Sequence, residues 1–130
     1  HRDTRGRWCI RVIHLGPGHL VGIGGATGAL LRYLVAEFVP AGEYPYGTIA
    51  VNVLGSFLLG LAVFAGIGGD AGLLVGTGLL GAFTTFSSFS FETVRLWETG
   101  DRRRAVGNLL GTFLGAVGAI GVAWATAMLL

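Results

Sequence analysis

The sequence predicts an all-α membrane protein with four transmembrane helices. Its 130 residues are 52% hydrophobic and 12% charged, with a mean hydropathy of +0.70, whereas average soluble chains are about 25% charged. Four apolar stretches approach or exceed the roughly 20 residues that a helix needs to cross a bilayer. This composition argues against a disordered chain, an ordinary nucleic-acid-binding module and a soluble enzyme of this size.

The chain divides into a basic N-terminal arm, residues 1–19, and a membrane domain, residues 20–130. We expect the arm to be flexible, either as a solvated tail or as a segment that contacts anionic lipid headgroups. A secretory signal is the alternative for the first apolar stretch. The apolar region of a signal is about 7–15 residues long, and this stretch is longer. We therefore interpret it as a retained span.

The four predicted spans cover about residues 20–38, 47–67, 72–91 and 105–130. Only Arg32 and Glu37 interrupt the first span, and the other three spans contain no charged residue. The connections are short, except for the charged linker at about 92–104. This leaves no room for a separate soluble domain.

The third span has an unusual composition that predicts a break near its middle. Three glycines, Gly76, Gly78 and Gly81, precede or begin a ten-residue segment, 81–90, that contains five hydroxyl side chains and three phenylalanines. Unwound backbone inside a membrane is tolerated only where protein or water satisfies it. The carbonyls freed by such a break can form a cation site.

The arginines give no clear orientation in the membrane. Four arginines lie on the side of the N-terminus and four on the side of the 92–104 linker: Arg2, Arg5, Arg7 and Arg11 against Arg95, Arg102, Arg103 and Arg104. Orientation normally follows an imbalance in this count. Two interpretations remain open, a dual topology with antiparallel pairing of two copies, or one orientation fixed by local details.

Neutral hydrogen-bond donors line the faces of two spans. Thr48, Asn52 and Ser56 recur at steps of four in the second span, and Asn108 and Thr112 are four apart in the fourth, so each set shares one helix face. Amide and hydroxyl groups donate hydrogen bonds, and the edge of a phenyl ring is electropositive. This chemistry permits a pathway for a small, strongly hydrated anion but does not by itself establish one.

Three motifs, at residues 24–33, 47–57 and 81–89, the last followed by Glu92, resemble those of the Fluc-type (CrcB-like) fluoride channel family. The resemblance covers the chain from about Gly24 to its end. It implies an antiparallel, dual-topology homodimer in the plasma membrane with two fluoride pores. It also implies a structural Na⁺ ion at the dimer centre, held by the backbone carbonyls of Gly81 and Thr84.

The resemblance also implies roles for individual side chains. Asn52 is expected to donate to fluoride, Phe86 and Phe89 to present their ring edges, and Thr85 and Ser88 to add hydroxyls along the pore. Arg32 and Thr48 are expected near the aqueous vestibule. Asn108 and Thr112 are also predicted pore residues, although the fourth span departs from the tyrosine–serine pair expected there.

The leading hypothesis is passive export of fluoride from the cytoplasm. The expected partners are fluoride, a second copy of the chain and the lipid bilayer, with no nucleic acid. One alternative is a proton-coupled small dual-topology exporter, which needs a carboxylate inside the membrane, and Glu37 is the only candidate. Another alternative is a non-conducting membrane assembly subunit. No enzymatic activity is expected, because the sequence contains no nucleophile–base pair and no plausible metal cluster.

Overall fold

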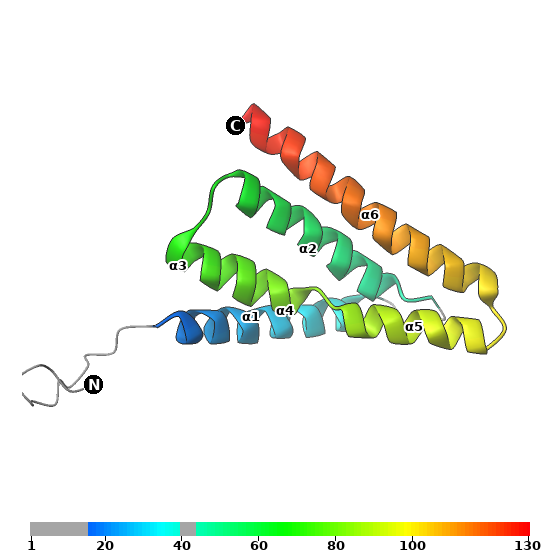
Figure 1. The fold of residues 1–130 in the computed structure, drawn as a ribbon. Helices are drawn as coiled ribbons and strands as arrows, with labels where there is room; N and C mark the ends of the chain where they lie inside the picture. Colours follow the sequence, from blue (N-terminus) through cyan, green and yellow to red (C-terminus); the bar gives the residue numbers. More distant parts are fainter. Residues whose placement is uncertain (1–15, 40–43) are drawn as a thin grey trace, which may run out of the picture.

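The described part of the chain folds into a bundle of four long helical segments that alternate in direction (Figure 1). The structure is a computed structural model that describes residues 16–39 and 44–130. Most of the predicted basic arm, residues 1–15, therefore lies outside the described residues. The elements are α1 (Pro17–Phe38), α2 (Tyr46–Phe64), α3 (Gly69–Ala71), the π-helix η1 (Gly72–Leu80), α4 (Gly81–Phe83), α5 (Phe86–Glu98) and α6 (Arg102–Leu129).

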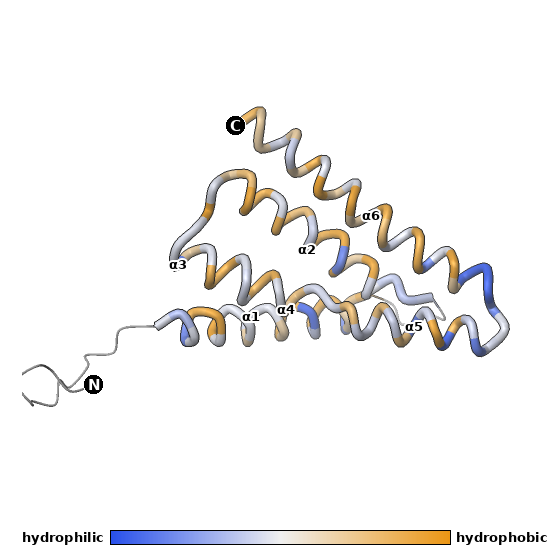
Figure 2. Tube along the Cα trace, in the orientation of Figure 1, coloured by the Kyte–Doolittle hydropathy of each residue, from blue (hydrophilic) through white to orange (hydrophobic). Residues whose placement is uncertain are grey.

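Within the residues that the structure describes, four helical segments are long and apolar enough to cross a membrane, which confirms the predicted number of spans. The third segment, Gly69–Glu98, combines α3, η1, α4 and α5. It continues seven residues past the predicted end at about residue 91, because the helix extends into the charged linker. Figure 2 shows the largest group of hydrophilic residues at the turn between α5 and α6, with isolated hydrophilic positions in α1 and α2, while the spans are mostly apolar. The chain is a multi-pass membrane protein.

Glycines allow α1 to pack closely against η1. A Cβ atom on Gly24 would collide with the backbone carbonyl of Leu74, and one on Gly28 with that of Leu79. From the opposite helix, a Cβ on Gly78 would come within 2.8 Å of the Val21 carbonyl oxygen. Small residues are the usual means of bringing membrane helices together, and here they hold the first half of the third span against α1.

The third span is interrupted at Thr84 and Thr85, as its composition predicts. Both residues have extended backbone conformations, with φ/ψ of −79°/157° and −147°/118°. The chain becomes helical again at Phe86, where the side-chain oxygen of Thr85 accepts a hydrogen bond from the backbone N–H of Ser88 at 3.2 Å. Thr85 is therefore the N-cap of α5, a position that threonine favours.

Candidate functional site

The break in the third span is held by Asn52 of α2. The backbone N–H of Thr85 donates to Asn52 Oδ1 at 2.7 Å, and Asn52 Nδ2 donates to the carbonyl oxygen of Thr85 at 3.0 Å. In an uninterrupted helix the Thr85 N–H would bond to the carbonyl of Gly81. The Asn52 amide thus satisfies both polar groups of the unwound residue, and its second N–H is available as a donor.

Asn52 lines a groove of about 310 Å³ between α2, the break and α6. The groove brings together five of the predicted pore residues, Asn52, Thr85, Phe86, Phe89 and Thr112, and none of the residues that line it is charged. Its remaining lining residues are Ser56, Leu59, Thr84, Phe113 and Ala116. The groove surface combines hydroxyl and amide donors with phenyl rings, which is the chemistry expected for an anion pathway lined by uncharged side chains.

Phe86 and Phe89 form an aromatic pair on the groove wall. Their ring centroids are 5.8 Å apart and the ring planes are inclined by 48°. Phe86 is 80% exposed in the single chain. The groove is therefore open on the side of Phe86.

A second cavity, of about 420 Å³, lies next to the groove. It is lined by the two predicted vestibule residues, Arg32 and Thr48, and by Ser88 and Glu92. Thr48 Oγ1 donates to Glu92 Oε1 at 2.9 Å. Thr85 lines both this cavity and the groove, so the two spaces meet at the break in the third span.

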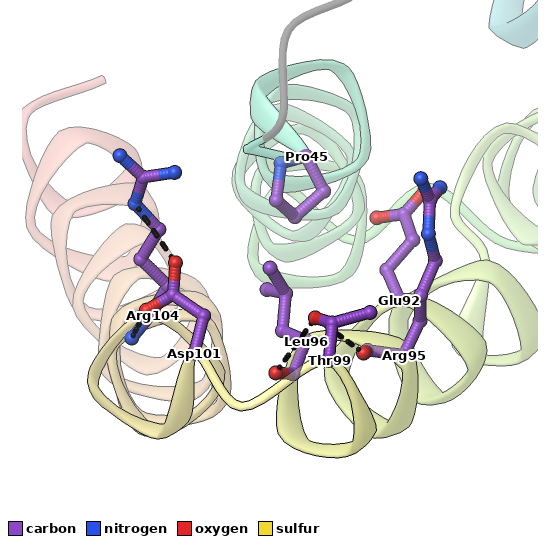
Figure 3. Close-up of a pocket in the computed structure, with 7 residues that line it drawn as sticks. All are labelled: Pro45, Glu92, Arg95, Leu96, Thr99, Asp101 and Arg104. Carbon is purple, nitrogen blue, oxygen red and sulfur yellow. Dashed lines mark hydrogen bonds and ion pairs between the residues drawn. The ribbon is translucent and has the colours of Figure 1, made fainter.

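A third, polar cavity of about 380 Å³ lies at the α5–α6 end of the bundle. In Figure 3, Glu92 and Arg95 extend from α5 on one side of it, and Arg104 extends from α6 on the other. Glu92 lines this cavity as well as the second one. The three spaces are thus linked in order, first through Glu92 and then through Thr85.

Asn108 occupies a different place from the other predicted pore residues. Its side chain is fully buried between α5 and α6 and does not line the groove. Its Nδ2 donates to Thr93 Oγ1 at 2.8 Å, and its Oδ1 lies 3.5 Å from the hydroxyl of Thr112. Asn108 therefore does not line the groove itself, but it is hydrogen-bonded to Thr112, which does.

The backbone around the break fits the predicted sodium ligands. The Gly81 carbonyl has lost its helical donor to Asn52 and faces the hydroxyl of Thr84 at 3.4 Å. The extended conformation of Thr84 also takes its own carbonyl out of the helix. Carbonyl oxygens are hard ligands that suit such a cation. Within residues 16–39 and 44–130, no group of His, Cys, Asp or Glu side chains is arranged to hold a metal ion.

Comparison with known proteins identifies the family. The sequence model of the CrcB-like proteins, described as "CrcB-like protein, Camphor Resistance (CrcB)", matches residues 19–125. The chain belongs to the CrcB-like family. This confirms the resemblance stated from the three motifs.

Curated CrcB-like relatives carry a functional name. The chain is 53% identical over 113 residues to "Fluoride-specific ion channel FluC 2" of Haloarcula marismortui, covering 87% of this chain and 95% of that one. It is 49% identical over 108 residues to "Fluoride-specific ion channel FluC 1" of Halobacterium salinarum, covering 83% and 91%. These relatives are named as channels and not as enzymes, in agreement with the expectation from the sequence.

Two residues that form hydrogen bonds around the groove and cavities, Glu92 and Thr93, are not among the predicted pore residues. Glu92 follows the third motif and carries no predicted pore role, yet it accepts from Thr48 and lines two cavities. Thr93 follows it and accepts from Asn108. The predicted end of the third span at about residue 91 places both residues in the linker, whereas α5 continues to Glu98 and carries them toward α2 and α6.

Proposed function

We propose that this chain is a passive, fluoride-selective channel that exports fluoride from the cytoplasm. The observation that carries the proposal is the groove at Asn52, where uncharged donors and phenyl rings surround a break in a membrane helix. The names of the CrcB-like relatives support fluoride as the ion. Fluoride is small and strongly hydrated, so a pore must replace its water without holding it tightly.

The anion route follows the three linked spaces. Arg95 and Arg104 line the outer cavity together with Glu92 and Asp101, and Arg104 pairs with Asp101 at 3.4 Å. Arg32 and Glu92 both line the next cavity. The arginines thus offset the carboxylates along the entrance, which would otherwise repel an anion. Ser88 and Thr85 then offer hydroxyls, and Asn52 offers the amide N–H that Thr85 does not use. Beyond the break, fluoride passes the ring edges of Phe86 and Phe89 and the hydroxyl of Thr112.

The conducting unit is an antiparallel homodimer with two pores. The exposure of Phe86 supports a second chain, because an anion in an open groove would face lipid on one side. A charge in contact with hydrocarbon is costly. The equal arginine counts on the side of the N-terminus and on the side of the 92–104 linker support insertion in both orientations. A two-fold axis in the membrane plane would then relate the copies.

A structural Na⁺ ion at the dimer centre is part of this proposal. The carbonyls of Gly81 and Thr84 would hold it, because the break leaves them without their ordinary helical donors. The ion would supply positive charge at the centre of the assembly. The chain itself contributes the unwound segment and the Asn52 amide that keeps it unwound.

Growth in fluoride tests the proposal in cells. A bacterial strain without its own fluoride channel should recover growth in millimolar fluoride when it expresses this chain, and intracellular fluoride should fall. The control is Asn52→Asp at equal membrane abundance, which should not rescue growth. Equal rescue by both, or none by the wild-type protein when it is present in the membrane, would contradict the proposal.

A further inference from the structure

Asn108 is the largest fully buried side chain in the described part of the bundle, at 0% exposure. A buried amide within a membrane helix requires partners, because hydrocarbon offers none. Its partners lie on two different elements, Thr93 on α5 and Thr112 one turn along α6. The side chain thus sits between the helix that carries the phenylalanine pair and the hydroxyl that lines the groove.

The side-chain nitrogen of Asn108, Nδ2, makes a short hydrogen bond. Asn108 Nδ2 donates to Thr93 Oγ1 at 2.8 Å, and Thr93 Oγ1 in turn donates to the backbone carbonyl of Phe89 at 2.8 Å. These short bonds form a continuous chain from α6 to the turn of α5 that carries the Phe89 ring. They fix the orientation of the Asn108 amide and, with it, the direction of Oδ1.

The side-chain oxygen of Asn108, Oδ1, takes part in a long hydrogen bond. Thr112 Oγ1 lies 3.5 Å from Asn108 Oδ1, whereas hydroxyl hydrogen bonds are typically 2.5–3.0 Å long. A threonine hydroxyl has one proton to donate. Because Thr112 also lines the groove, its proton has two possible acceptors, the Asn108 oxygen and an anion in the groove.

We infer that Asn108 is a positioning residue for the anion pathway, which aims the Thr112 hydroxyl and serves as its acceptor when the groove holds no anion. When fluoride arrives, the Thr112 proton turns from Asn108 Oδ1 to the anion. When fluoride leaves, the proton returns. This inference rests on the proposed fluoride channel, and it assigns Asn108 an action through Thr112 in place of direct contact with the ion.

A double-mutant cycle on fluoride efflux tests the inference, with purified protein in liposomes and a fluoride electrode. Thr112→Val should reduce the initial efflux rate at least fivefold, and Asn108→Ala should reduce it similarly. Because both changes remove the same aimed donor, the double variant should be within twofold of Thr112→Val. Independent effects would multiply, and a double-variant rate reduced by the product of the two single-variant losses would overturn the inference.

The dependence of the rate on fluoride concentration separates positioning from simple helix packing. Both single variants should need a higher fluoride concentration for half-maximal efflux, because the anion loses one donor. A packing role would lower the amount of folded protein and leave this concentration unchanged. An unchanged half-maximal concentration in well-folded Asn108→Ala protein would also overturn the inference.

A second pair of variants covers the case in which Asn108→Ala does not fold. Thr93→Val removes the acceptor that fixes the Asn108 amide, and Thr93→Ser retains it. Thr93→Val should behave like Thr112→Val and be non-additive with it, whereas Thr93→Ser should conduct within twofold of wild type. Equal rates for the Val and Ser variants would contradict the role of Asn108.

Thr126→Val is the matched control on α6, because the Thr126 hydroxyl bonds to its own helix at Val122 and does not line the groove. It should conduct like wild type. The outcomes also separate this inference from the proposed function. Absence of efflux from the wild-type protein would contradict the channel itself, and additive losses in a conducting protein would contradict only the role of Asn108.

Discussion

Asn52 and Thr85 exchange two hydrogen bonds across the gap between α2 and the broken third span, at 2.7 Å and 3.0 Å. A side-chain amide thus replaces the helical partners that the backbone of Thr85 would otherwise need. The same amide faces the groove. Asn52 therefore both supports the break in the third span and provides the proposed contact with the anion, so a substitution at Asn52 affects both.

Asn52→Asp should abolish fluoride efflux. The carboxylate still accepts from the Thr85 N–H, but it leaves the Thr85 carbonyl without its donor and adds a negative charge to the groove. Two like charges about 4 Å apart repel by about 4 kcal/mol at an effective dielectric constant near 20, which corresponds to roughly a thousandfold. Efflux from liposomes measures the loss, and size-exclusion chromatography checks assembly. Efflux near the wild-type rate would mean that Asn52 only packs the helices.

Phe86→Ile and Phe89→Ile should each reduce fluoride efflux by about tenfold or more, because an aliphatic side chain has no electropositive edge. The matched control is Phe91→Ile, since Phe91 lies on the same helix, is 68% exposed and does not line the groove. The control should conduct normally. Equal losses in all three variants would show that the effect comes from helix stability.

Gly28→Ala should destabilise the bundle by about 1–3 kcal/mol, the usual cost of overpacking, because its Cβ would collide with the carbonyl of Leu79. Gly22→Ala on the same helix is the control, since a Cβ there meets nothing within 4 Å and alanine favours helix. Thermal unfolding in detergent measures the difference. Equal melting temperatures for the two variants would contradict the close α1–η1 packing.

Extra arginines near the α5–α6 turn should favour one orientation in the membrane. Glu98→Arg with Thr99→Arg raises the count on that side from four to six, which breaks the balance that supports dual topology. Orientation is read by labelling a cysteine at Gly68, where a Cβ meets nothing within 4 Å, in a Cys9→Ser background. Fluoride efflux should fall as one orientation disappears. Full efflux with only one orientation labelled would contradict the antiparallel dimer.

The sequence was sufficient to predict the spans and the break, because both depend on local composition. Runs without charge determine the four spans, and the density of hydroxyls after Gly81 indicates the break. The π-helix over Gly72–Leu80 was not predicted, because no residue type signals a change of helical pitch. The pairing of Asn52 with Thr85 joins residues 33 apart in the chain, and no periodicity within one helix reveals such a contact.

In the fourth span as well, the sequence predicts which residues share a helix face but not which residues they contact on other helices. The spacing of Asn108 and Thr112 correctly places them on one helix face, and both are buried. Only the packing of α6 on α5 shows that Thr112 reaches the groove while Asn108 turns to Thr93. Spacing therefore predicts which residues share a face, and the neighbouring helix determines what each residue touches.

Anion efflux from liposomes measures directly whether this chain is a passive fluoride channel. Purified wild-type protein is reconstituted, valinomycin clamps the membrane potential, and fluoride and chloride release are followed in parallel without a proton gradient. A passive, fluoride-selective channel should give rapid fluoride release with little chloride release. Absence of fluoride release from correctly folded, dimeric protein would contradict it, and release that begins only when a proton gradient is imposed would indicate a coupled exporter instead.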